Sequence, residues 1–158
     1  MKNIKNITIA ILALVVSVSL YSFRLVPPPA GVSIVVIVNK DNPVASLTAG
    51  EVKLYWMRKI KTRWPNINKN IRPVDHKTKC SEQETFYWKV LGMTSDEVET
   101  YFVTKQYQNA QKPQDKFASD REIVDFVGEE VGAIGFINAA NLTPEAKSKV
   151  KVVFTLSN

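Results

Sequence analysis

The stretch Ile71–Gly92, IRPVDHKTKCSEQETFYWKVLG, decides the fold, because it predicts a strand, a polar loop and an amphipathic helix in succession. Residues 71–74 carry the strand signal and are followed by a polar segment without periodicity. Ser81 and Glu84 form a capping-box pattern, so we expect the helix to begin at Ser81 and to stop at Gly92. Such a connection is either an ordinary strand–helix turn or an anion site at a helix N-terminus.

The first 32 residues have the pattern of an export segment. Lys2 and Lys5 form a positive region, and residues 7–20 form an apolar run that is short for a membrane-spanning helix. Three prolines at 27–29 predict a stiff spacer. We therefore expect residues 1–32 to be a signal peptide, or an uncleaved N-terminal anchor, plus a spacer. Residues 33–158 would then form one domain in the periplasm or cell envelope.

The composition is typical of a globular protein: 45% of the 158 residues are hydrophobic and 23% are charged. The formal net charge is +6. Three of the 21 basic residues and none of the 15 acidic residues lie in residues 1–32, so the rest of the chain is only mildly basic. This balance, together with the export segment, argues against a nucleic-acid partner.

Residues suited to catalysis or metal binding are few. Cys80 is the single cysteine and His76 the single histidine, which excludes an intramolecular disulfide and an ordinary zinc site. The predicted helix N-terminus beside Cys80 should lower the pKa of its thiol. No set of nucleophile, base and orienting residue is evident. We expect a binding protein that has no catalytic activity, metal or cofactor.

The remaining pattern predicts an α/β protein, a mixed sheet flanked by helices. Residues 33–39, SIVVIVN, are typical of a strand buried on both faces. Further elements are expected as follows: helices after Thr48, Thr94 and Ser119, a long polar loop at 105–116, a short helix or turn at 143–148, and strands at 131–138 and 150–154.

Residues 52–74 contain seven basic residues and no acidic residue, with Trp56 and Trp64 interleaved. The stretch could form an anion-attracting surface. It could equally be a solvated basic face whose tryptophans pack inward.

Three segments resemble the periplasmic phosphate-binding proteins of ABC transporters, which have the type II periplasmic binding protein fold. They are VVIVNKDNPVASLTAGEVKLYWMRKIKTRWP at 35–65, RPVDHKTKCSEQETFYWKVLG at 72–92 and FASDREIVDFVGEEVGAIGFIN at 117–138. The resemblance covers one lobe and leaves no chain for a second. It therefore implies a single-lobe α/β domain that binds phosphate or another small anion and meets a membrane transporter or another envelope protein.

In this resemblance the family's anion-binding Ser-Gly-Thr-Arg loop falls on residues 80–83, which are Cys-Ser-Glu-Gln here. Gln83 lacks the paired charged donors of the family's Arg, and Glu82 adds negative charge. The ligand-binding residues implied by the resemblance and the preceding polar loop at 75–79 are Asp75, His76, Lys79, Cys80, Ser81 and Gln83. An alternative function is a periplasmic interaction or assembly protein that no longer binds a ligand. A homodimer or another protein could supply the missing lobe.

Overall fold

The computed structural model describes residues 31–59, 62–110 and 112–157. Its elements are β1 (Ile34–Asn39), α2 (Ala49–Trp56), β2 (Arg72–His76), α3 (Ser81–Phe86), a π-helical turn (Tyr87–Leu91), α4 (Ser95–Asn109), β3 (Asp115–Phe117), α5 (Asp120–Glu129), β4 (Ala133–Asn138), a 3-10 turn (Ala139–Asn141), α6 (Pro144–Lys149) and β5 (Val150–Leu156). The predicted signal peptide or anchor lies outside these residues apart from its last two positions. Within the described ranges, no helix combines the length and the hydropathy that a membrane span requires.

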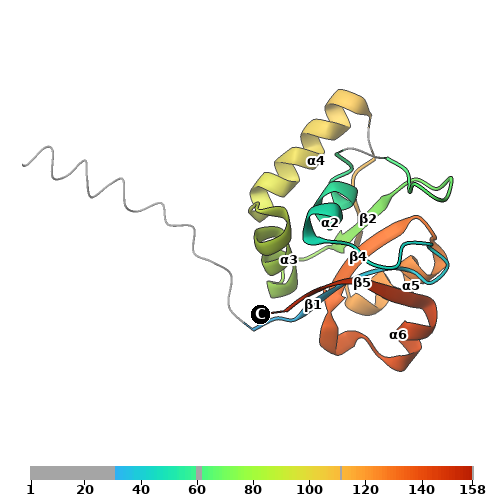
Figure 1. Ribbon diagram of the computed structural model, residues 1–158. Helices are drawn as coiled ribbons and strands as arrows, with labels where there is room; N and C mark the ends of the chain where they lie inside the picture. Colours follow the sequence, from blue (N-terminus) through green and yellow to red (C-terminus); the bar gives the residue numbers. More distant parts are fainter. Residues whose placement is uncertain (1–30, 60–61, 111, 158) are drawn as a thin grey trace, which may run out of the picture.

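The strands form one sheet in the order β3-β2-β4-β1-β5 (Figure 1). Strand β2 is parallel to β3 and β4, whereas β1 is antiparallel to β4 and β5. The predicted mixed α/β sheet is therefore confirmed. Because β1 has neighbours on both edges and helices over both faces, all six of its residues are buried, as its β-branched run predicts.

An apolar layer packs on each face of the sheet. On the face covered by α2, α3 and α4, the rings of Phe86 and Phe136 stack 4.1 Å apart, and Trp56 meets Phe86 edge-on. On the face covered by α5 and α6, Ile37 and Ile123 belong to the second layer. The sheet thus lies between two apolar cores, and neither core covers the ends of its strands.

Thr48 and Thr94 are the N-caps of α2 and α4, and each forms a reciprocal capping box, as the sequence predicts. Ser119 also accepts a hydrogen bond from the N–H of Glu122. The carboxylate of Glu122, however, accepts from Ala118 N instead of closing the box on Ser119. At each of these helix starts, the cap side chain therefore satisfies a backbone N–H donor of the first turn.

The start of α3 differs from the expected capping box. The helix begins at Ser81 as predicted, but its N-cap is Cys80, which makes no side-chain cap hydrogen bond. The hydroxyl of Ser81 donates to Glu82 at 3.1 Å instead. The helix continues into the π-helical turn and stops at Gly92, whose left-handed φ of 65° suits glycine, as predicted.

Two predicted loops are shorter than expected. Asp75 and His76 were assigned to a polar loop, but both are buried residues of β2. The loop predicted at 105–116 was wrong over much of its length, because α4 continues to Asn109 and residues 115–117 form β3. The second half of α4 is polar because it is exposed, and β3 is a three-residue edge strand with no apolar run to announce it.

For the basic stretch, the structure confirms that Trp56 and Trp64 pack inward, since both are almost fully buried. Arg72 is held by Asp115 and Glu130 at 2.9 and 2.8 Å. Part of this basic charge is therefore neutralised by carboxylates from other elements.

Candidate functional site

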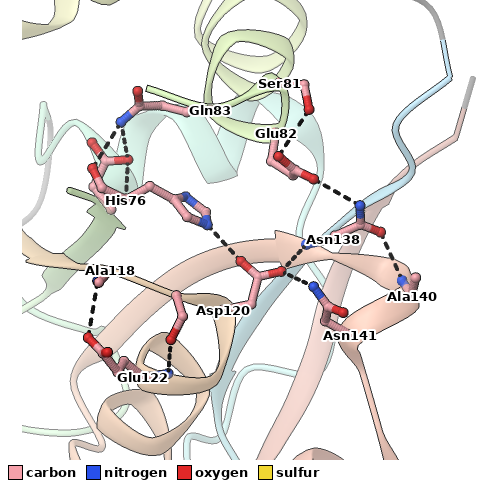
Figure 2. Close-up of polar contacts among 12 residues, drawn as sticks. His76, Ser81, Glu82, Gln83, Ala118, Asp120, Glu122, Asn138, Ala140 and Asn141 are labelled. Atoms are coloured by element: carbon pink, nitrogen blue, oxygen red, sulfur yellow. Dashed lines mark hydrogen bonds and ion pairs between the residues drawn. The ribbon is translucent and has the colours of Figure 1, made fainter. Parts of the chain in front are cut away.

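The candidate site lies at the carboxyl ends of β2 and β4, where α3 and α5 begin (Figure 2). His76 is the last residue of β2 and Asn138 the last of β4, and the two strands are parallel. Strand ends and helix starts therefore converge at one edge of the sheet, which is the usual place for ligands in open α/β sheets.

Asp75 lies beneath this edge and is fully buried. Its carboxylate accepts hydrogen bonds from Gln83 Nε2 at 2.9 Å, from His76 N at 2.8 Å and from the hydroxyl of Tyr87. Burial raises the pKa of Asp75, and the three donors offset only part of this effect. Asp75 thus anchors Gln83 and Tyr87 from below, with its carboxylate occupied by groups of the chain itself.

His76, the last residue of β2, is buried beside the ring of Phe136. Its Nε2 lies 2.7 Å from Asp120 Oδ1 (Figure 2). The other oxygen of Asp120 accepts from Asn138 N at 2.9 Å and from Asn141 Nδ2 at 2.8 Å. Burial opposes ionisation of Asp120, but these hydrogen bonds outweigh it and hold the pKa of its carboxyl below the usual range.

A second carboxylate occupies the start of α3. Glu82 accepts from Asn138 Nδ2 at 2.9 Å and from the hydroxyl of Ser81. Burial opposes ionisation of Glu82, but its hydrogen bonds lower the pKa of the carboxyl, and the bond from Asn138 has the largest effect among them. Glu82 and Asp120 therefore hold the amide donors of Asn138 and Asn141 at the positions where two helices begin (Figure 2). An anion cannot take these donors without displacing a carboxylate of the chain.

Cys80 does not have the lowered pKa that its position beside a helix N-terminus led us to expect. Partial burial raises the pKa of its thiol to about 11, because this effect and the negative charge of Glu82 together outweigh the lowering by the backbone N–H groups at the helix start. The thiol is therefore protonated at neutral pH.

A pocket of about 210 Å³ opens beside this cluster, between β2, β3, α3 and α4. Its lining residues are His76, Lys77, Lys79, Gln83, Tyr87, Ser95, Val98, Glu99, Gln114 and Lys116. Of the six residues predicted to bind a ligand, the structure brings His76, Lys79 and Gln83 to this pocket. The other three, Asp75, Cys80 and Ser81, do not line it.

The pocket is basic, and two of its lining residues each have a buried polar atom without a protein partner. Lys77, Lys79 and Lys116 outnumber the single carboxylate, that of Glu99. Lys79 forms an exposed 3.3 Å ion pair with Asp96, which contributes little stability. His76 Nδ1 and Gln114 Nε2 are buried and have no hydrogen-bond partner among the described residues. Buried polar atoms of this kind generally need a partner, so the pocket is suited to a polar ligand.

Sequence reasoning missed Gln114, Lys116 and Glu99 as pocket residues. The first two lie in the segment taken for a loop, and β3 brings them beside β2 through its parallel pairing. The only sequence signal was that a long polar stretch often carries function. In the described ranges, no group of three or more His, Cys, Asp or Glu side chains is placed to hold a metal ion.

No protein-family model matches the chain, and no curated protein sequence matches it either. Solved structures of phosphate-transport proteins do match. They include an ABC-type phosphate transport receptor from Vibrio cholerae, at 16% identity and a TM-score of 0.55, covering 77% of this chain and 46% of that chain. PstS from Borrelia burgdorferi matches at 13% identity and a TM-score of 0.54, covering 77% and 47%.

A third match is a Clostridium perfringens protein assigned as a phosphate ABC transporter substrate-binding protein and solved with bound phosphate. It is 21% identical, with a TM-score of 0.56, and the match covers 77% of this chain and 45% of that chain. The chain therefore spans less than half of the length of each of these proteins. Over 77% of its own length it has the α/β fold of these proteins.

Proposed function

We propose that this protein is an exported, non-enzymatic binding protein whose basic pocket takes a small anion such as phosphate. The observation that carries the proposal is a pair of buried, unpartnered atoms, His76 Nδ1 and Gln114 Nε2, on two residues that line a pocket with three lysines. The fold shared with phosphate-transport proteins supports the same function.

The anion is better accommodated in this pocket than at the N-terminus of α3. At the helix start, Glu82 already supplies a negative charge and accepts from Asn138. In the pocket, Lys77 and Lys116 are exposed cations that a bound anion would neutralise. Gln83, which replaces an expected arginine, lines the pocket while its amide donates to Asp75.

The test is calorimetric titration of inorganic phosphate, with sulfate as a comparison, into the purified protein at low salt. We expect the double variant Lys77→Gln/Lys116→Gln to weaken phosphate binding by about 30-fold, since each lysine contributes on the order of 1 kcal/mol at short range. The matched control is Lys40→Gln/Lys147→Gln, which removes the same charge at exposed positions that do not line the pocket.

Equal weakening in both double variants would show that net charge, rather than the pocket, attracts the anion. No binding heat at millimolar phosphate in the unmodified protein would remove the anion-binding proposal.

A second candidate function is a periplasmic interaction or assembly protein without a small ligand. It is favoured by the donors of Asn138 and Asn141, which are already occupied by Glu82 and Asp120. Such a protein should expose a large apolar patch to its partner. In the part of the chain that the structure describes, the large hydrophobic side chains that are exposed are Val103 and Tyr107, and neither lines the pocket.

We rank the interaction function second for this reason. Under either function, we propose that the protein works in the periplasm or cell envelope beside a membrane transporter or another envelope protein. A homodimer could supply the missing lobe. Crosslinking in intact cells, followed by identification of the attached protein, distinguishes a transporter from another partner.

A further inference from the structure

The two ring nitrogens of His76 have opposite environments. Nε2 lies 2.7 Å from Asp120, whereas Nδ1 is buried and has no hydrogen-bond partner in the described ranges. We propose that His76 contacts the bound anion through Nδ1 and takes up a proton when the anion binds. This inference rests on the proposed anion pocket and specifies how that pocket binds: it takes an oxyanion together with a proton.

In the empty pocket, Nδ1 of His76 has no partner within the described part of the chain. Asp120 is an ionised carboxylate and can only accept, so Nε2 carries a hydrogen and donates to it. In the neutral imidazole the remaining nitrogen, Nδ1, then holds a bare lone pair. Protonating Nδ1 would bury an N–H group that has no acceptor among the described residues, which costs free energy. The described residues of the empty pocket therefore offer no partner for a proton on Nδ1.

A bound anion would change the surroundings of Nδ1. An oxyanion beside Nδ1 supplies both the missing acceptor and a negative charge, so it favours the protonated ring. The ring would then donate to the anion through Nδ1 and to Asp120 through Nε2. Asp120 is fixed for this purpose by Asn138 N and Asn141 Nδ2. The ring position is fixed as well, because it lies against Phe136.

The charges around the ring act in the same direction. Cations of the pocket disfavour a proton on His76, and a bound anion offsets their effect. The carboxylates on neighbouring elements favour the proton, with Asp120 in direct contact. The charged and titratable groups on the elements around His76 are Asp75 and Lys77 from β2 and its end, Lys79 from the loop before α3, Glu82 and Tyr87 from α3 and the π-helical turn, Glu99 from α4, Lys116 from β3 and Asp120 from α5.

The sign of the pH dependence follows from linkage. Because the anion is bound together with a proton, affinity is greatest at pH values where the ring is already protonated. Affinity falls by about tenfold per pH unit over the range in which binding takes up the proton, and above that range it no longer depends on this group.

The experiment uses the fact that His76 is the only histidine in the chain. Its imidazole NMR signals therefore need no assignment. We would titrate the protein from pH 5 to pH 8.5 without anion and with saturating sulfate, which does not itself titrate in this range, and then with phosphate. We expect either anion to raise the apparent pKa of the imidazole. Calorimetry in two buffers of different ionisation enthalpy should show uptake of up to one proton per anion.

The variant His76→Gln keeps a polar side chain and should bind the anion with no proton uptake beyond that of phosphate itself. Anion binding that leaves the imidazole pKa unchanged would overturn the inference and leave the proposed function standing. Unchanged proton uptake in His76→Gln would overturn it too. If neither anion binds at any pH in the range, the inference and the proposed function both fail. The NMR titration of the unmodified protein decides the question if the variant does not fold.

Discussion

At the scale of the single residue, the buried carboxylate of Asp75 is the strongest constraint on the site. Asp75→Ala would leave the donors of Gln83, His76 and Tyr87 without their acceptor, so we expect the free energy of unfolding to fall by about 2–5 kcal/mol. Asp75→Asn keeps an acceptor and removes the buried charge, so its effect at pH 7 should stay within about 1 kcal/mol. Urea unfolding at pH 7 measures both variants.

The same carboxylate gives a pH-dependent prediction. Because burial raises the pKa of Asp75 in the folded protein, the folded state holds its proton more tightly than the unfolded state does. The unmodified protein should therefore lose stability relative to Asp75→Asn as pH rises above about 4, the usual pKa of an aspartate. The loss should end once pH passes the folded pKa. Urea unfolding of both proteins from pH 3 to pH 8 measures the difference, and a constant difference would contradict the assigned shift.

His76 and Lys79 were predicted from the polar segment before a predicted helix, and Gln83 from the resemblance to the family's anion-binding loop; all three line the pocket. Sequence reasoning did not find that Asp75 points into the core, since an aspartate at the end of a short strand looks like a loop residue until its partner Tyr87 is known. It also missed the contact between His76 and Asp120, because nothing local links two residues so far apart in sequence.

At the scale of the element, two glycines show how strongly the effect of one added methyl group on stability depends on its position. A Cβ at Gly132 would lie 2.2 Å from the backbone oxygen of Asn70, whereas a Cβ at Gly50, in α2, would meet open space. We expect Gly132→Ala to lower the free energy of unfolding by about 2–4 kcal/mol. Gly50→Ala should raise it by about 0.5 kcal/mol, because alanine favours the helix. Denaturant unfolding of both variants would contradict this contrast if the two effects had the same sign.

Helix α4 should have uneven stability along its length. Its first half buries Val98 and Phe102, while Val103 and Tyr107 in its second half are 45% and 87% exposed. We expect amide hydrogens of residues 105–109 to exchange by local fraying, much faster than those of β1. Hydrogen-exchange mass spectrometry measures this, with the first half of α4 as the internal control. Uniform protection along the helix would indicate that the second half is covered by another surface.

Element prediction succeeded where apolar period and capping chemistry agree, as at Thr94 with Glu97, and failed where neither is present. Strand β3 has three residues and no apolar alternation, so its place is set by pairing with β2 and not by its own propensity. The polar half of α4 looked like a loop because a solvent-exposed helix end needs no apolar stripe.

At the scale of the whole molecule, the two core layers share one sheet, so they should unfold together. Tryptophan fluorescence reports on the layer that contains Trp56 and Trp64, whereas far-ultraviolet circular dichroism reports on all elements. For the domain predicted at residues 33–158, we expect the two signals to give the same urea midpoint. Separate midpoints would show that the α5–α6 layer is an independent unit, or that the domain boundary was misplaced.

The overall fold could be predicted because β1 and the segment at 131–138 are so apolar that they must be interior strands, and because three segments resemble one family. The pocket could not, since its lysines come from elements that only the sheet order brings together. Sheet order depends on long-range pairing, about which a local sequence pattern says little.

The pairing of β1 also determines when this protein can fold. Strand β1 is near the start of the described chain, yet its two neighbours, β4 and β5, lie close to the end. During translation, β1 therefore leaves the ribosome long before either neighbour has been made. Such long-range pairing slows folding. The nascent chain therefore cannot close its central sheet until both late strands have been synthesised, and up to that point it stays open.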